Sequence, residues 1–370
     1  MSMRIMACCF LLLLTLNGEG LAQPIYAIEG ALHRGHMIVH RPLVDGLQSE
    51  RIKGYEVSLY GRVSGKKQWH HDYKIPFGGI YAGWWNLGNK NTLGYSFSIV
   101  PFIDFKLSSG KKTSFNLKFG WGIGINEKKF DAENNYKNVV IGSKINNSIL
   151  LHPTFSYRFT EKTCVKVGLS LFHLSNGSFE NPNLGINLIS FTTGLVFGFG
   201  NDTVYAPFSQ KEGEIKHEAF VYGSMFAKEI APPDGKRYTT ASLVFDHMWK
   251  TSRKMSFGGG VDVFYDKSLT QRSNYNEQDG ILGIIRSGIH GGTEMRIGST
   301  SIILNMGAYF YSGAGGESIF HRFGIRQKLK QKWALVLHVK SHWGKADHME
   351  IGIGRSLSNR NRLKKDINTN

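Results

Sequence analysis

The sequence predicts an all-β protein, a transmembrane antiparallel β-barrel fold with about 16 strands in total. Three observations predict this class. Large apolar residues alternate with small or polar ones along many segments, and glycine is abundant, at 44 of 370 residues. The chain also contains no stretch of about 18 apolar residues, which a transmembrane helix would need. A soluble β-sandwich would alternate as well, but its apolar residues would face inward.

The N-terminus predicts export of the chain. Residues 1–23, MSMRIMACCFLLLLTLNGEGLAQ, contain one early arginine, an apolar core from Ile5 to Leu16 and an exit of small residues. This is the layout of a secretory signal peptide, and the apolar core is too short to span a bilayer. Cys8 and Cys9 lie within it, so cleavage leaves Cys164 alone and no disulfide framework is expected.

The charge of the chain predicts the kind of surface that it meets. The formal net charge is +17 at pH 7, which suits an acidic partner. An exported barrel has no access to nucleic acid, so we expect anionic lipid or lipopolysaccharide instead. Together with the signal peptide, this indicates the outer membrane as the location.

The strand segments put their apolar residues on one face. In residues 92–107, one face holds Leu93, Tyr95, Phe97, Ile99 and Ile103, and the other holds Gly94, Ser96, Ser98 and Asp104. Residues 114–126 alternate in the same way between large apolar residues and Asn116, Lys118 and glycines. A period of two places each set on one side of a strand. We expect the apolar set to face lipid and the polar set to face the lumen.

The lengths of the connections predict the topology. Short basic turns are expected at Ser64–Lys67, Ser108–Lys112, Thr160–Thr163, Thr251–Lys254 and Leu329–Lys332, and long loops at Asn126–Asn146 and Tyr265–Gly280. Outer-membrane barrels alternate short periplasmic turns with long outer loops. The segment Asn176–Ile186 then lies on the outer side.

The chain divides near the polar segment Asn201–Gly213. Residues 24–200 form one barrel region, residues 201–357 an additional region that completes or duplicates it, and residues 358–370 a charged tail. One barrel is favoured over two eight-stranded barrels, because so short a connection leaves little room for two closed barrels side by side.

Residues 165–187, VKVGLSLFHLSNGSFENPNLGIN, contain the candidate site. Counting by twos from the apolar face of this strand reaches His173 and Ser175, and counting back along the next strand reaches Asn187. Neighbouring strands lie about 5 Å apart, so these side chains can meet. Polar groups on a lipid-facing wall are costly and indicate function.

These residue types suit ester hydrolysis. An imidazole takes the proton of a serine hydroxyl as its oxygen attacks a carbonyl carbon. Asn187 can hold the ring of His173 through its side-chain oxygen. Backbone N–H groups of the turn at Asn176 and Gly177 are the expected oxyanion donors. The other interpretation from the residues alone is that His173 and Ser175 bind lipid headgroups.

The segment FHLSNGSFENPNLGIN resembles the active-site signature of the lipid A 3-O-deacylase family of outer-membrane barrels, also called acyloxyacyl hydrolases. The resemblance covers about residues 25–200. It implies that Ser175 is the nucleophile, that His173 is the base, and that Asn176 with Gly177 shapes the oxyanion site. It also implies hydrolysis of an acyl ester of lipid A without a cofactor.

Two features depart from the resemblance. Asn187 stands where the family has a glutamate, and an amide can orient an imidazole but cannot neutralise an imidazolium. Glu180, in the preceding loop, is the alternative acid. The second departure is the length beyond residue 200, whose last hairpin, residues 332–354, echoes the site hairpin. There His338 and His342 fall on the other face, so a duplication without the catalytic pair and a coincidence both stay open.

The remaining alternatives are a metal site and a channel. His33, His36 and His40 do not share one strand face, so no metal site is predicted. The rival to the esterase is a non-enzymatic barrel, a porin or scaffold, with a vestigial His-Ser pair. The loop FDAENNYKNVVIGSKINNS either covers the site and binds phosphate through Lys137 and Lys144 or is an ordinary solvated loop, and the second is favoured.

Overall fold

The computed structural model describes residues 26–200, 217–233 and 235–358. The predicted signal peptide, the segment Asn201–Gly213 and the tail from residue 359 lie outside the described residues. The chain forms two compact units, one around each of two barrels. Each unit is described by itself.

The first barrel consists of β1 to β8. Their bounds are β1 Tyr26–Met37, β2 Ile52–Arg62, β3 Phe77–Asn86, β4 Tyr95–Ser109, β5 Thr113–Asn126, β6 Ile145–Arg158, β7 Thr163–Ser175 and β8 Ile186–Phe199. Two short helices lie in its connections, η2 (Pro42–Val44) and α2 (Gln68–Asp72).

The second barrel consists of β9 to β16. Their bounds are β9 His217–Glu229, β10 Arg237–Lys250, β11 Met255–Asp266, β12 Ile285–Ile297, β13 Thr300–Tyr311, β14 Ile319–Lys328, β15 Trp333–His342 and β16 Lys345–Ser356. Its connections contain the short helices η3 (Lys267–Gln271), η4 (Glu277–Asp279), η5 (Leu282–Ile284) and η6 (Lys330–Lys332). None of the helices in the described ranges has the length and apolarity that a membrane crossing requires.

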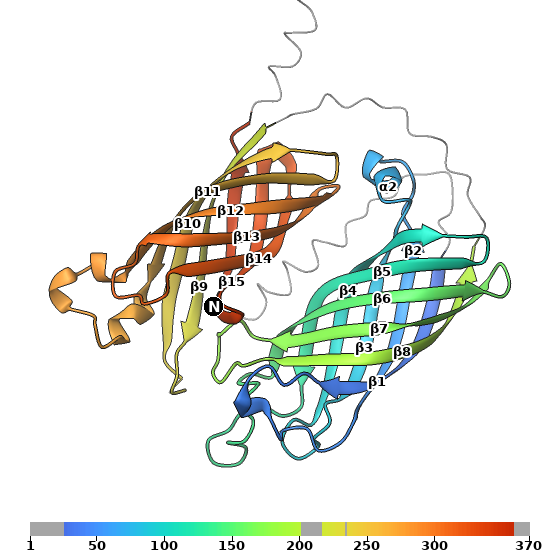
Figure 1. Cartoon of the computed structure of the whole chain (residues 1–370), viewed down its shortest axis with the longest axis horizontal. Coiled ribbons are helices and arrows are strands. Elements are labelled where there is room, and N and C mark those ends of the chain that lie inside the picture. Colours follow the sequence, from blue (N-terminus) through green and yellow to red (C-terminus); the bar gives the residue numbers. More distant parts are fainter. Residues whose placement is uncertain (1–25, 201–216, 234, 359–370) are drawn as a thin grey trace, which may run out of the picture. The chain divides into compact units, whose positions relative to one another are not determined.

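The all-β class is confirmed, but the preferred single barrel is wrong. In the first barrel β1 pairs antiparallel with β8, from Tyr26↔Phe199 to Met37↔Leu188 (Figure 1). In the second, β16 pairs with β9. Each set of eight strands is therefore a closed barrel. Closure satisfies the hydrogen bonds of both edge strands within each set, and no edge is left to join the two sets.

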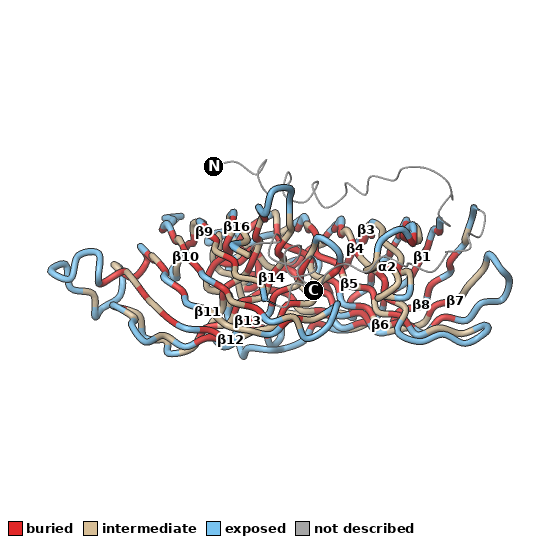
Figure 2. The backbone as a smooth tube through the Cα atoms, turned by 90° about the horizontal axis from the view of Figure 1, so that it is seen from above, coloured by how far each residue is buried: buried red, intermediate tan, exposed pale blue. Residues whose placement is uncertain are grey.

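The predicted alternation of faces is present in the strands. Buried and exposed residues alternate along them (Figure 2). In β4, Ser96 and Ser98 are buried while Phe97 and Ile99 are exposed. Leu93 departs from its predicted outward position, because it precedes β4 and is buried in the loop.

The connections named in the sequence prediction have the expected lengths with one exception. Residues 127–144 and 267–284 form long connections where long loops are expected. The connection expected as a short turn at Ser64–Lys67 instead runs from residue 63 to residue 76 and contains α2. The spacing of polar and apolar residues did not predict this helix, because α2 is too short to show a helical period.

Buried charges fill the lumen of the first barrel. Lys118 Nζ lies 3.1 Å from Glu29 Oε2 and 2.6 Å from Glu56 Oε1. Lys166 Nζ lies 3.2 Å from both Glu29 Oε2 and Asp104 Oδ2. An eight-stranded barrel is just wide enough for its own side chains, so this network occupies the space that a channel would need.

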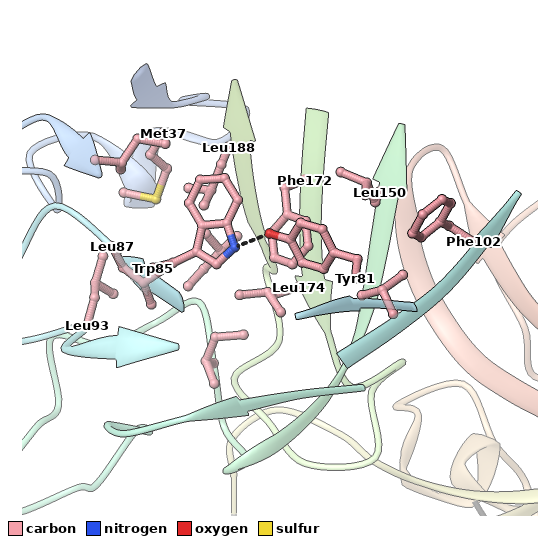
Figure 3. Close-up of a cluster of buried hydrophobic side chains, with 14 of the residues drawn as sticks. Met37, Tyr81, Trp85, Leu87, Leu93, Phe102, Leu150, Phe172, Leu174 and Leu188 are labelled. Carbon is pink, nitrogen blue, oxygen red and sulfur yellow. Dashed lines mark hydrogen bonds between the residues drawn. The ribbon is translucent and has the colours of Figure 1, made fainter. Parts of the chain in front are cut away.

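An apolar cluster lies in the same barrel and backs the site strands (Figure 3). Trp85 stacks on Phe172 of β7 and donates to the Tyr81 hydroxyl at 3.0 Å. Leu174 of β7 and Leu188 of β8 join the cluster and are buried. The inward residues of β7 and β8 therefore fix both strands to the core, which orients their outward residues.

The second barrel has a comparable polar interior. Arg322 lies between Asp262, at 2.9 Å, and Glu350, at 2.6 Å. Arg326 contacts Asp246 and Glu294. These side chains are buried, so ion pairs fill this lumen as well.

Candidate active site

The candidate residues lie on the outward face of adjacent strands. His173 and Ser175 end β7, on the same face as the exposed Leu169 and Leu171. Asn187 is the second residue of β8, and the antiparallel register sets it directly opposite His173. The apolar neighbours of these residues along the two strands, Leu174 and Leu188, point inward to the core. Period-two alternation from the sequence thus located this face correctly.

The three side chains form a hydrogen-bonded chain. His173 Nε2 lies 2.8 Å from Ser175 Oγ, and His173 Nδ1 lies 2.7 Å from Asn187 Oδ1. Because an amide oxygen only accepts, Nδ1 carries the ring proton and donates it to Asn187. Nε2 is then the free acceptor for the Ser175 hydroxyl proton. This is the tautomer that a general base requires.

The polypeptide at Ser175 is held from the neighbouring strand. Asn147 of β6 faces Ser175 in the register, and its Nδ2 donates to the Ser175 carbonyl at 3.2 Å. Trp121 Nε1 donates to Asn147 Oδ1 at 3.2 Å. The strand that carries the hydroxyl is therefore fixed on both sides, by β6 and by β8.

The turn after Ser175 differs from the expected oxyanion site. The backbone N–H of Asn176 donates to Asn183 Oδ1 at 3.0 Å, and its side chain donates to Ser143 Oγ at 2.9 Å. This backbone N–H is therefore engaged within the loop. Gly177 follows with φ +63°. Asn183 Nδ2 is buried and has no hydrogen-bond partner among the described residues.

Gly185 was missed by the sequence analysis. Its φ is +78°, and a Cβ built there would lie 3.1 Å from His173 Cε1. Its N–H donates to the Val140 carbonyl at 3.0 Å. The signal was present in the Leu-Gly-Ile segment before β8, because a glycine there permits both the backbone turn and the close approach of the ring.

The loop of residues 127–144 contacts the site. Val140 and Ile141 are buried, and Val140 and Ser143 hydrogen bond to the site loop. The favoured interpretation as an ordinary solvated loop is therefore wrong for this part of it. A short apolar Val-Val-Ile run within a polar segment was the available signal.

His40 is another residue that the sequence analysis set aside. It lies in the connection after β1, and its ring contacts Asn187 Nδ2 through Nδ1 at 3.2 Å. Glu180, the alternative acid, is not among the partners that the structure gives to His173. Both ring nitrogens of His173 already have other partners, Ser175 and Asn187.

Comparisons with solved structures give low overall similarity. The crystal structure of the outer membrane enzyme PagL is 17% identical with a TM-score of 0.33, covering 45% of this chain and 97% of that chain. Neisserial surface protein A is 11% identical with a TM-score of 0.33, covering 47% and 97%. A triple mutant of the Rh. blastica porin is 8% identical with a TM-score of 0.19, covering 90% and 100%.

Comparisons of the sequence with protein families are more informative. No curated protein matches the chain. The family model for lipid A 3-O-deacylase matches residues 53–196, which include His173, Ser175 and Asn187. The model for the C-terminal domain of acyloxyacyl hydrolase matches residues 215–359. One model thus covers most of each barrel, and the chain belongs to the lipid A 3-O-deacylase (acyloxyacyl hydrolase) family of hydrolases, which form outer-membrane β-barrels.

Proposed function

We propose that the chain is an outer-membrane serine esterase that removes an ester-linked acyl chain from lipid A or a related outer-leaflet lipid. One observation carries the proposal: Ser175, His173 and Asn187 are hydrogen bonded to one another on the outward face of the first barrel. The family of the chain supports the same chemistry.

The proposed reaction has two steps. Ser175 Oγ attacks the acyl carbonyl carbon while its proton moves to His173 Nε2. His173 then gives that proton to the leaving alcohol oxygen as the ester bond breaks. A water molecule attacks the acyl-serine and loses a proton to His173, which passes that proton to Ser175 Oγ as the acyl–oxygen bond breaks and the fatty acid leaves. Oxygen and proton balance without a cofactor.

The wall around the site suits a lipid substrate. Leu169 and Leu171 of β7 and Ile189 of β8 lie on the outward face and are 52%, 41% and 39% exposed. An acyl chain can lie along this wall with its ester at the polar end of the strands. We assign the unpartnered Asn183 Nδ2 and the N–H of Gly177 as candidate oxyanion donors.

The neutral amide at Asn187 has a chemical consequence. It holds the ring of His173 in the required tautomer, but it places no negative charge next to the imidazolium that forms during the reaction. We therefore expect slower hydrolysis than a carboxylate at this position would give.

The test is release of fatty acid from purified lipopolysaccharide, measured by mass spectrometry. Ser175→Ala and His173→Ala are each expected to lower release by about 10³-fold or more. Labelling of Ser175 by a fluorophosphonate probe should disappear in His173→Ala. Wild-type release from both folded variants would refute the proposal.

The channel alternative is less well supported. Lys118 and Arg322 lie within the two lumens with fully buried side chains, and each contacts two carboxylates. Among the residues that the structure describes, these side chains occupy the space that a water-filled path through an eight-stranded barrel would need. Planar bilayers that contain the chain should therefore show no steady ion conductance.

A further inference from the structure

An asparagine in the third position of a catalytic triad has an orientation problem. A carboxylate presents an acceptor whichever way it turns, but an amide has an oxygen at one end and a donating NH₂ at the other. If the Asn187 amide turned over, its NH₂ would donate to His173 Nδ1. The ring proton would then sit on Nε2, and His173 could not take the proton of Ser175.

His40 supplies the group that prevents this rotation. Its Nε2 lies 2.9 Å from the Leu184 carbonyl, and a carbonyl only accepts, so Nε2 carries the proton of the neutral ring. Nδ1 is then an acceptor, 3.2 Å from Asn187 Nδ2. The Ile38 carbonyl, also 3.2 Å from Nδ1, is not a hydrogen-bond partner in this tautomer.

The backbone keeps His40 beside Asn187. The N–H of Ile38 donates to the Asn187 carbonyl at 2.8 Å, which extends the pairing of β1 with β8. The ring of His40 is thus held close to Asn187 by a main-chain contact only two positions away. His40 itself is exposed at the end of the barrel, so its replacement removes no core packing.

We infer that His40 is a positioning residue that fixes the Asn187 amide and, through it, the tautomer of His173. The inference rests on the proposed function and extends it. The hydrogen bonds run from Ser175 to His173, to Asn187, to His40 and to the Leu184 carbonyl, and each donor has one acceptor. His40 therefore contributes to the reaction only by orienting the Asn187 amide, and it does not contact the reacting atoms.

The first experiment measures hydrolysis of lipopolysaccharide by the full chain in detergent. His40→Phe is expected to lower kcat about tenfold with little change in KM, because one orienting hydrogen bond is lost. His40→Gln retains most activity, since its side-chain oxygen can accept from Asn187. His36→Phe is the matched control: His36 is exposed on β1 and contacts Gln48, at 3.4 Å, rather than the site.

A second experiment repeats the His40→Phe substitution in a chain that lacks the Asn187 amide. Asn187→Asp puts two acceptor oxygens at the position, so no orienting partner is needed. His40→Phe is expected to change kcat by less than about twofold in the Asn187→Asp chain, against about tenfold in the wild-type chain. An equal loss in both backgrounds, or no loss in the wild-type chain, would overturn the inference.

Nitrogen NMR of histidine-labelled protein separates this inference from the proposed function. His173 is expected to carry its proton on Nδ1 in the wild type and to show a mixture of tautomers in His40→Phe. An unchanged tautomer contradicts the role of His40. An inactive wild type with the tautomer shift contradicts the esterase proposal and leaves the role of His40 supported.

Discussion

The hairpin β7–β8 of the first barrel and the hairpin β15–β16 of the second barrel occupy the same place in their barrels but differ in chemistry. Each contains the penultimate and last strands of its barrel. In β7–β8, His173 faces Asn187 across the strands. In β15–β16, Val339 faces Met349. The common fold alone therefore does not produce the candidate site, whose residues occupy a few outward positions of the first barrel.

The polar residues of the second hairpin point the other way. His338 and Lys340 of β15 are fully buried in the lumen. The predicted face assignment of His338 agrees with the structure. This hairpin also contains a histidine, a lysine and a serine close together, but His338 and Lys340 point into the lumen, because a shift by one residue changes the face of a strand.

The connections of the two hairpins also differ. Residues 176–185 separate β7 from β8 and supply hydrogen bonds around Ser175. Trp343 and Gly344 alone separate β15 from β16, with φ of +49° and +78°. Such a tight turn has no room for a pocket of N–H donors. A site of this type needs outward polar residues and a loop that surrounds them.

Replacing one histidine in each barrel tests this contrast with the largest expected effect. His173→Ala should lower kcat/KM for lipopolysaccharide by about 10³ to 10⁴-fold, because the general base is lost. His338→Ala removes a buried lumen histidine and should leave kcat/KM of the folded protein unchanged. A large loss of activity in His338→Ala would show that the second barrel takes part in the reaction.

Removing one lumen cation in either barrel should destabilise the chain to a similar extent. Lys118→Met removes the buried cation that Glu29 and Glu56 share, and Arg322→Met removes the one that Asp262 and Glu350 share. We expect a loss of about 3–5 kcal/mol of unfolding free energy in each, measured by denaturation in detergent.

The matched control for the lumen cations is a partly exposed pair. Lys328 contacts Glu218 at 2.7 Å, and its side chain is 33% exposed. Lys328→Met should cost at most about 1 kcal/mol, because solvent screens the pair. Equal losses in all three variants would mean that burial does not set the strength of these interactions.

The strands and their faces could be predicted from the local sequence pattern. Which strands pair to close each barrel could not. Alternation predicted the strand faces and the total strand number, because each depends on neighbouring residues. Which strand pairs with β1 depends on contacts between residues far apart in sequence, such as Tyr26 with Phe199. Alternation is identical for one large barrel and two small ones, so it could not distinguish them.

The arrangement of the candidate site residues could likewise be predicted in part. Counting by twos brought His173, Ser175 and Asn187 together, since strand geometry determines it. His40, Asn183 and Gly185 lie in loops or at strand ends, where spacing has no fixed period. Their contacts with the site depend on how three connections fold together, and the sequence carries no simple rule for that.

Two glycines with the same backbone angle separate loop geometry from loop function. Gly185 and Gly344 both have φ +78°. A Cβ on Gly185 would lie 3.1 Å from His173 Cε1, whereas one on Gly344 meets nothing within 4 Å. Alanine at either position should cost about 1–3 kcal/mol through backbone strain.

Only the change at Gly185 should affect catalysis. Gly185→Ala displaces the His173 ring and is expected to lower kcat about 10- to 100-fold, whereas Gly344→Ala retains wild-type kcat. The measurement is hydrolysis at matched amounts of folded protein. Equal kcat in the two variants would show that the ring of His173 tolerates the shift.

The smallest expected effect comes from building the three side chains into the second hairpin. Ser341 already follows Val339 by two positions, as Ser175 follows His173, and Val339 faces Met349. Val339→His with Met349→Asn, made in a Ser175→Ala chain, therefore supplies the same residue types on β15 and β16. We expect no recovery of fatty acid release, because the register shifts between Lys340 and Ser341 and the turn Trp343–Gly344 offers no oxyanion donors. Recovered hydrolysis would mean that three outward side chains suffice and that the loop of residues 176–185 serves only to connect its strands.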